Sequence, residues 1–330
     1  MQKLIKCLKK ALPVALAWSA ITGFGVTQAA AEPNWPSRPI ELVIPQGPGG
    51  GTDVLGRLWA KSVSGYLGQS VVAVNKPGAN GIVATNYVNQ KKPDGYTFLL
   101  TGVSYLTINP HMYKSLAYDP KKDFDGVALL ANTPFVLTAS NATGIKNFEQ
   151  FVQAAKAAKQ PMTFASAGKG NSTHLVMEML NDRLGLNMLH VPYTGGKLAL
   201  SVISGEVDFA ANVMNSIKAA AKNGDAMALA IIGPSRSDNL PGVPTLQELG
   251  IENFPMPGWY ALVAPKGTPQ DVINRVNEAT QKFFADPEAA AILRSMDMEP
   301  LPGDASMVGK WMDRDSVVWG ELIKSKNLAE

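Results

Sequence analysis

Apolar strand segments alternate with amphipathic helix segments along most of the chain, and this alternation constrains the fold more than any other feature. A strand is expected at Ile40–Ile44, a helix at residues 53–67 and a second strand at residues 71–74. The first unit continues with a turn at residues 77–81, a helix up to residue 90 and a strand at residues 96–101. Such alternation is typical of α/β folds with mixed, mainly parallel sheets flanked by helices.

The same pattern repeats after a long extended stretch, residues 127–139, which is interrupted only at residues 132–134 and which we interpret as a crossing between two lobes. The repeat comprises helices at residues 147–159, 174–184 and 197–204 and strands at residues 163–166, 188–191 and 208–212. The chain is expected to return at residues 226–233 and to finish with a strand at residues 259–264 and helices at residues 269–285 and 306–324. Residues 32–133 and 233–330 are thus assigned to lobe 1 and residues 134–232 to lobe 2, with a ligand cleft between them.

The N-terminus has the features of an export signal. Lysines near the start precede an apolar stretch, and three alanines end it at Ala31, before Glu32. Residues 1–31 are therefore predicted to be a cleaved signal peptide, which implies a periplasmic protein. A membrane anchor is the alternative, but the apolar stretch is short and interrupted by Pro13 and Gly23.

Composition excludes several classes of function. Without residues 1–31 the chain has 26 basic and 27 acidic residues, because four of its 30 lysines and arginines lie in that segment, so no nucleic-acid partner is expected. The only cysteine, Cys7, also lies there, which leaves no thiol for a disulfide or a thiolate metal site. No cofactor or metal motif is found, and none is predicted.

A glycine-rich loop joins the first strand to the first helix. Glycines let the backbone approach a ligand, and the first N–H groups of a helix have no partner within it, so this loop suits a carboxylate or phosphate. The loop lacks the third glycine of the dinucleotide motif G-x-G-x-x-G, and no Lys-Ser/Thr pair follows it as in a P-loop. Both absences argue against a nucleotide. Asp53 is interpreted mainly as a helix cap, although it could also accept a ligand hydroxyl or ammonium. The candidate contacts here are Gly49, Gly50, Gly51, Thr52 and Asp53.

A second loop of this kind follows the strand at residues 163–166. One anion loop in each lobe predicts a clamp that holds an anion between two helix N-termini, although each loop alone could be only a tight turn. The candidate contacts here are Ser166, Ala167, Gly168, Asn171, Ser172, Thr173 and His174. Further candidates for the cleft wall are Tyr193, the Gly195-Gly196 turn, Asn212 and, as aromatic cover, Tyr105, Trp259 and Tyr260.

Catalytic patterns are sparse. The histidines, His111, His174 and His190, lie in unlike contexts, and no serine elbow, paired carboxylate or zinc motif accompanies them. The protein is therefore predicted not to be an enzyme. A lyase or hydrolase that uses His174 and Asp53 as acid and base is the alternative.

Ordered motifs along residues 35–327 identify a family resemblance. They include Trp-Pro-Ser-Arg-Pro-Ile at residues 35–40, Pro-Gly-Gly-Gly-Thr-Asp at residues 48–53, Lys-Pro-Gly-Ala-Asn-Gly at residues 76–81 and His-Val-Pro-Tyr-Thr-Gly-Gly at residues 190–196. The chain resembles the Bug-type (TctC-like) periplasmic solute-binding proteins of tripartite tricarboxylate transporters. The resemblance implies a type II Venus-flytrap fold that closes on a small organic acid, with Ser104, at the end of the third strand, as a further contact.

The resemblance also implies partners. They are a small organic acid and the large and small membrane subunits of a tripartite tricarboxylate transporter, while a sensor kinase that reads the closed lobes remains an alternative. This chain departs from many relatives at Gln46 and Tyr105, where apolar or smaller residues are frequent. Gln46 and Tyr105 are therefore expected to tune specificity, for an aromatic or a hydroxylated carboxylate, and a dicarboxylate is among the candidates.

Overall fold

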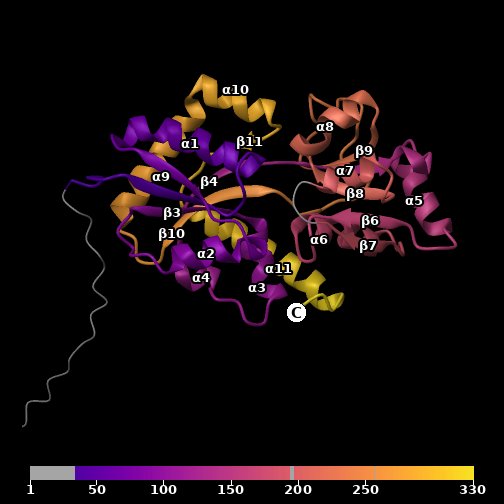
Figure 1. Cartoon of the computed structure of the whole chain (residues 1–330), viewed down its shortest axis with the longest axis horizontal. Helices are drawn as coiled ribbons and strands as arrows, with labels where there is room; N and C mark the ends of the chain where they lie inside the picture. The colour runs from indigo at the N-terminus through magenta and orange to yellow at the C-terminus, as the bar shows by residue number, and fades with distance from the viewer. Residues whose placement is uncertain (1–33, 194–196, 256) are drawn as a thin grey trace, which may run out of the picture.

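The computed structural model describes residues 34–330, apart from residues 194–196 and residue 256. The strands form two separate sheets, one in the order β11-β4-β10-β3-β1-β2 and one in the order β7-β6-β8-β5-β9. Figure 1 shows the sheets in two lobes that lie side by side, each covered by helices. The predicted two-lobed α/β fold is confirmed, while the expected signal peptide lies outside the described residues.

Lobe 1 is built on the first sheet. Its β1 pairs in parallel with β2 and β3, while β10 runs antiparallel between β3 and β4, so the sheet is mixed. Its elements are β1 (Ile40–Ile44), α1 (Gly51–Leu67), β2 (Val71–Asn75), α2 (Ile82–Asn89), β3 (Thr97–Gly102), the π-helical turn η2 (Ser104–Ile108), α3 (Asn109–Met112), α4 (Pro120–Asp123), β4 (Phe124–Asn132), β10 (Trp259–Pro265), α9 (Gln270–Ala285), α10 (Pro287–Ser295), β11 (Glu299–Pro300) and α11 (Ser306–Ser325).

Lobe 2 is built on the second sheet in the same manner. Here β6 is parallel to β7 and β8, and β5 is the antiparallel strand, between β8 and β9. Its elements are β5 (Phe135–Ser140), α5 (Phe148–Ala157), β6 (Thr163–Ser166), α6 (Ser172–Arg183), β7 (Leu189–Pro192), α7 (Lys197–Ile203), β8 (Phe209–Val213), α8 (Met214–Asn223) and β9 (Ala226–Ile232). In lobe 1 two strands, β10 and β11, run against the direction of the others, and in lobe 2 one strand, β5, does so.

Two crossings connect the lobes. β4 ends at Asn132 in the first sheet and β5 begins in the second, and the Thr133 N–H donates to the Gly258 carbonyl at 2.6 Å, so the outgoing and returning chains touch. The segment after β9 remains in contact with the second sheet, because Ile231 bridges Thr245 and Leu240 packs in its core. We therefore propose that the return to lobe 1 lies near Gly258 rather than at residue 233.

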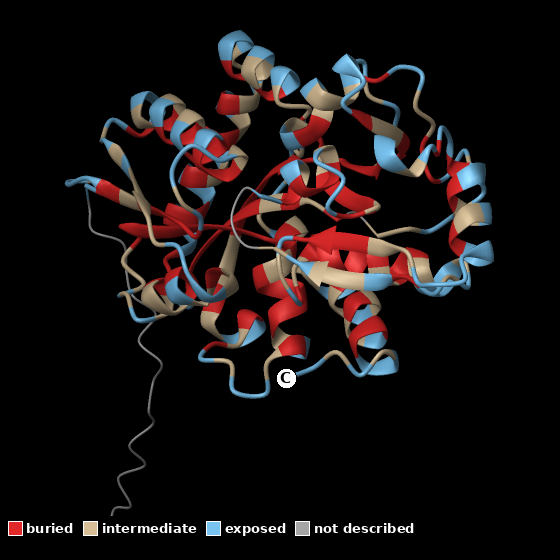
Figure 2. Ribbon diagram, turned by 45° about the vertical axis from the view of Figure 1, so that its right-hand side comes forward, coloured by how far each residue is buried: buried red, intermediate tan, exposed pale blue. Residues whose placement is uncertain are grey.

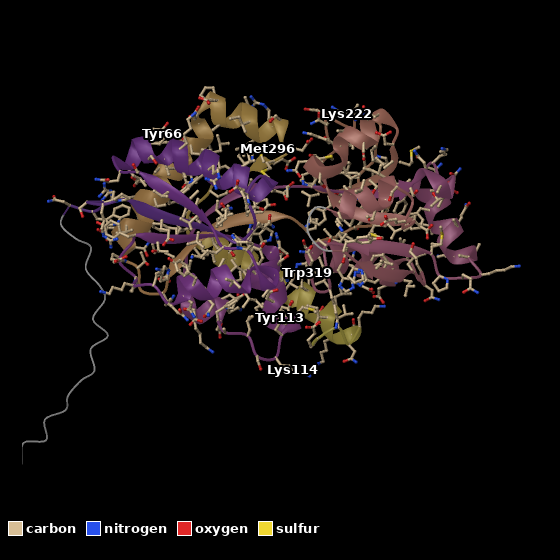
Figure 3. The ribbon with its side chains drawn as sticks, viewed as in Figure 1. Tyr66, Tyr113, Lys114, Lys222, Met296 and Trp319 are labelled. Carbon is tan, nitrogen blue, oxygen red and sulfur yellow. The ribbon has the colours of Figure 1, made fainter. Side chains whose placement is uncertain are left out.

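The strands carry the buried core of each lobe, and the exposed residues lie mainly on the outer helix faces and the loops (Figure 2). One cluster of buried apolar side chains includes residues of both sheets, such as Trp259 and Phe135. Helix α11, which carries Trp319 (labelled in Figure 3), packs on β4 in lobe 1 and on α6 in lobe 2. No helix among the described residues is both long and apolar enough to cross a membrane.

Candidate functional site

The first glycine loop leaves a row of backbone donors open. It connects β1 to α1, which begins at Gly51, two residues before the predicted start. Gly49 has a φ of 86°, a left-handed conformation that favours glycine. Gly50 is the N-cap of α1, and no side chain bonds to the first turn in its place. The donors that meet no acceptor among the described residues are the N–H groups of Gly50, Gly51, Thr52 and Asp53.

Asp53 shapes this loop. Its carboxylate accepts hydrogen bonds from the Gly49 N–H at 2.9 Å, from Arg57 Nε at 3.0 Å and from Asn75 Nδ2 at 2.8 Å. Burial alone would raise the pKa of Asp53, but these hydrogen bonds outweigh it and hold the pKa below its ordinary value. Asp53 therefore bonds to the residue before the N-cap, and three donors already engage its oxygens.

Hydroxyl and amide groups lie beside the open donors. Gln46 Nε2 donates to Tyr105 Oη at 3.3 Å, which leaves the Tyr105 proton for another acceptor. Burial raises the pKa of Tyr105 to about 12, so this hydroxyl stays protonated at neutral pH. Thr52 Oγ1 lies 3.4 Å from Tyr260 Oη. Ser104, expected at the end of a strand, instead begins η2, because β3 ends at Gly102.

The second glycine loop differs, because its donors are used within the loop. The Ala167 N–H donates to Thr173 Oγ1 at 2.9 Å and the Gly170 N–H to His174 Nδ1 at 3.2 Å. Asn171 caps α6 by accepting from the Thr173 N–H at 3.0 Å. The remaining internal bonds are those of the N–H groups of Gly168, Asn171 and His174. Only Lys169 and Ser172 retain N–H groups that meet no acceptor among the described residues.

The second loop packs against two histidine rings, of which His174 is buried and His190 is half-buried. Ser166 is fully buried, and its Oγ lies 2.6 Å from His190 Nε2. His190 stacks near His174, with ring centroids 3.9 Å apart, and His174 is only 2% exposed. Burial and the neighbouring His174 lower the pKa of His190 to about 4. The structure therefore places both histidines in packing roles, and His174 and Asp53 lie on different lobes in separate hydrogen-bond networks.

Two other expected contacts have partners of their own. Tyr193 Oη donates to Glu206 Oε2 at 3.1 Å. Asn212 is fully buried and donates from Nδ2 to Thr138 Oγ1 at 2.9 Å, while its Oδ1 meets no donor among the described residues. The Gly195-Gly196 turn lies outside the described residues.

Helix α8, which the sequence patterns did not predict, reaches the first loop from lobe 2. Val213 is its N-cap, and no side chain bonds to its first turn. A Cβ built on Gly51 would lie 2.5 Å from Asn215 Nδ2 and 3.6 Å from Met298 Cε, so the Asn215 amide occupies the space beside the α1 N-terminus. Asn215 makes no hydrogen bond to another described residue. A single Asn after a short strand carries no sequence signal for this position.

Other concave features lie elsewhere. Cavities of about 460 Å³ and 320 Å³ lie in lobe 1 near α4 and α11, and none of the expected contacts lines them. Within residues 34–193, 197–255 and 257–330, no group of three His, Cys, Asp or Glu side chains could hold a metal ion.

Two α/β lobes joined by adjacent crossings, with open helix donors where they meet, define a solute-binding receptor of the periplasmic type. Residues 55–328 match the model of the tripartite tricarboxylate transporter family receptor, TctC, so the chain belongs to this family. The family is one of receptors, and a similar solved structure is that of the periplasmic binding protein BugD, so the chain is a solute receptor and not an enzyme.

Individual proteins agree with this assignment. A UPF0065 protein of Bordetella pertussis is 37% identical over 268 residues, which cover 81% of this chain and 83% of that protein. The structure of R. palustris Rpa4515 with adipate is similar at a TM-score of 0.81 and 27% identity, covering 89% of this chain and 99% of that one. MatC (Rpa3494) from Rhodopseudomonas palustris with bound malate gives a TM-score of 0.75 at 26% identity, covering 88% and 100%.

Proposed function

We propose that this receptor binds a small organic dicarboxylate between its lobes, with one carboxylate at the N-terminus of α1. The observation that carries the proposal is the run of four consecutive N–H groups, Gly50 to Asp53, that donate to no other described residue. Such a run at a helix N-terminus is an anion site, because its donors and the helix dipole favour the same charge.

Neutral donors would hold the carboxylate. Arg57, the basic side chain beside the loop, already bonds to Asp53 at 3.0 Å and to Asn75 Oδ1 at 2.7 Å. Each backbone hydrogen bond to a charged acceptor contributes about 1.5 to 3 kcal/mol. The Thr52 hydroxyl belongs to the same run, and the hydrogen bond that it donates to Tyr260 Oη is long, at 3.4 Å, so its proton could turn to a ligand carboxylate.

Two kinds of support favour a dicarboxylate. Gln46 and Tyr105 form a neutral hydrogen-bonding pair, and the free Tyr105 proton suits a second carboxylate or a hydroxyl. Two similar receptors have structures with adipate and with malate, which are aliphatic dicarboxylates. We propose that Gln46 and Tyr105 contact the far end of the ligand.

The proposed role is transport. The family is described as the receptor of tripartite tricarboxylate transporters. The receptor would act in the periplasm after removal of residues 1–31 and would deliver its ligand to the large and small membrane subunits of such a transporter.

The test is a comparison of acids with neutral analogues. Adipate, malate and succinate are titrated into the purified protein beside adipamide, and binding is followed by calorimetry and thermal unfolding. A ligand at a hundred times its Kd stabilises the native state by about 2.7 kcal/mol. We expect at least one diacid to bind and adipamide not to bind. If no acid of a wider aliphatic and aromatic panel binds, or if adipamide binds as tightly as the diacid that binds best, the proposal is wrong.

A further inference from the structure

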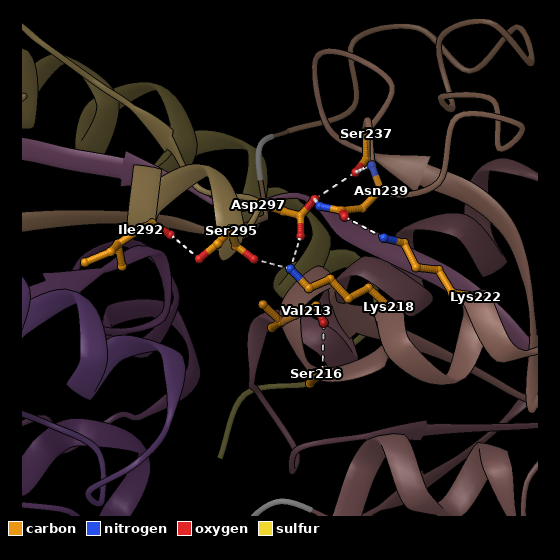
Figure 4. Close-up of polar contacts among 9 residues, drawn as sticks. All are labelled: Val213, Ser216, Lys218, Lys222, Ser237, Asn239, Ile292, Ser295 and Asp297. Carbon is orange, nitrogen blue, oxygen red and sulfur yellow. Dashed lines mark hydrogen bonds and ion pairs between the residues drawn. The ribbon is translucent and has the colours of Figure 1, made fainter. Parts of the chain in front are cut away.

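One carboxylate of lobe 1 accepts hydrogen bonds from three side chains that pack with lobe 2. Asp297 follows α10 and lies next to β11, and it receives Lys218 Nζ at 2.7 Å, Ser237 Oγ at 2.8 Å and Asn239 Nδ2 at 2.7 Å. Figure 4 shows these contacts across the gap between the lobes. We call these four residues the Asp297 clamp.

The clamp is shielded and fixed from both sides. The Asp297 side chain is 6% exposed and that of Lys218 is 22% exposed, so solvent screens the ion pair much less than a surface pair. Lys218 also donates to the Ser295 carbonyl, and Lys222 holds Asn239 at 2.7 Å. In Figure 3 the labels of Met296 and Lys222 mark its two sides.

The backbone of Asp297 ends helix α10. Its φ is 54°, a left-handed conformation that commonly closes a helix and that aspartate adopts more often than most residues. The Asp297 N–H donates to the Arg294 carbonyl at 3.0 Å and the Met298 N–H to the Leu293 carbonyl at 2.9 Å. The backbone of Asp297 is therefore fixed within lobe 1, which leaves its carboxylate to accept the three donors that pack with lobe 2.

Helix α8 of lobe 2 connects the clamp to the first glycine loop. Lys218 lies one turn after Asn215, and Asn215 is the side chain that occupies the space beside Gly51. The lobes cannot separate at this point unless the hydrogen bonds of Asp297 break. The clamp therefore fixes the distance between α8 and the open donors of α1.

We propose that Asp297 and Lys218 are positioning residues that hold α8 against the first glycine loop and so set the population of closed lobes, on which ligand affinity depends. This inference rests on the proposed function only for its effect on affinity. A receptor whose closed form is partly populated binds with an affinity reduced by that fraction.

Two variants test the clamp. Asp297→Asn removes the charge but keeps the left-handed backbone, which asparagine tolerates, and Lys218→Met keeps the apolar stem without the ammonium. Lys61→Met is the matched control, because its ion pair with Glu288 lies within lobe 1 and is exposed, at 75% and 69%.

The first measurement needs no ligand. The only natural cysteine is Cys7, so Lys156→Cys on α5 and Lys282→Cys on α9 can carry spin labels, one on each lobe. We expect double electron–electron resonance to give a longer or broader distance in both clamp variants and an unchanged one in Lys61→Met. Distances unchanged in both clamp variants would overturn the proposal.

The second measurement is the Kd for the diacid that binds best. Both clamp variants are expected to bind about five- to tenfold more weakly, while Lys61→Met stays within twofold of the parent protein. If the parent protein binds no acid, the proposed function fails, and the distance measurement still decides the clamp. If the distances widen but the affinity stays within twofold, the positioning role is wrong.

Discussion

The two glycine loops look alike in sequence but differ in what their backbones can still bind. Between Gly47 and Asp53 the helix cap is a glycine, and four N–H groups remain open. Between Ser166 and His174 the side chains of Thr173, Asn171 and His174 take the donors instead. A strand–loop–helix unit is thus an anion site only where its own side chains leave the donors free, and we expect the first loop to bind and the second to support.

The largest effect is expected at Gly51. Gly51→Val places a side chain where Asn215 Nδ2 would be 2.5 Å away and also covers the open donors. We predict a loss of about hundredfold in diacid affinity, or about 2.7 kcal/mol. Calorimetry measures it beside Gly47→Ala, whose new Cβ meets nothing within 4 Å. Affinity within threefold of the parent protein in Gly51→Val would contradict the role of the first loop.

The second loop is tested by Thr173→Val. The Thr173 hydroxyl accepts from the Ala167 N–H and donates to Asn171 Oδ1. Valine has almost the same volume but removes both of these hydrogen bonds. We predict that the free energy of unfolding falls by about 1 to 3 kcal/mol while diacid affinity changes less than threefold. Urea unfolding and calorimetry give the two numbers. A large loss of affinity at unchanged stability would mean that this loop also binds the ligand directly.

Thr52→Val is the matched change in the first loop. Thr52 Oγ1 has only a long contact of 3.4 Å to Tyr260, so the fold depends little on it. We predict that affinity falls about five- to tenfold, or about 1 kcal/mol, with stability nearly unchanged. The same titrations and urea curves apply. If Thr52→Val lowers stability as much as Thr173→Val does, the contrast between the loops is lost.

The smallest effect concerns pH and the support under the second loop. The pKa of His190 is about 4 in the folded protein, below its ordinary 6.5, so the unfolded chain binds the extra proton first as pH falls. The stability that comes from the low pKa of His190 is fully present above pH 6.5 and is lost as the pH falls toward 4. We predict that His190→Gln loses about 1 kcal/mol less than the parent protein between pH 7 and 4.5, after allowance for partial exposure. Equal losses in urea unfolding at the two pH values would refute this.

Much of the fold followed from the sequence because periodicity is local. The strands at Ile40–Ile44 and Thr163–Ser166 have the expected bounds, and the crossing at Thr133 and Pro134 lies where the apolar stretch is interrupted. Helices α8 and α10 were missed. The sequence also did not reveal that the segment after Ile232 packs on lobe 2, because the contacts that hold it there come from residues distant in the chain.

The sequence by itself determined the α/β pattern, the two loops and the family resemblance, because strand and helix periods, glycines and ordered motifs are written along the chain. Only the tertiary structure decided which loop keeps open donors, since the acceptors that fill the second loop are set by side-chain geometry. It also decided that Asn215 meets Gly51 and that Asp297 meets Lys218. These pairs join residues of different lobes, and no local pattern records a contact that forms only when two sheets come together.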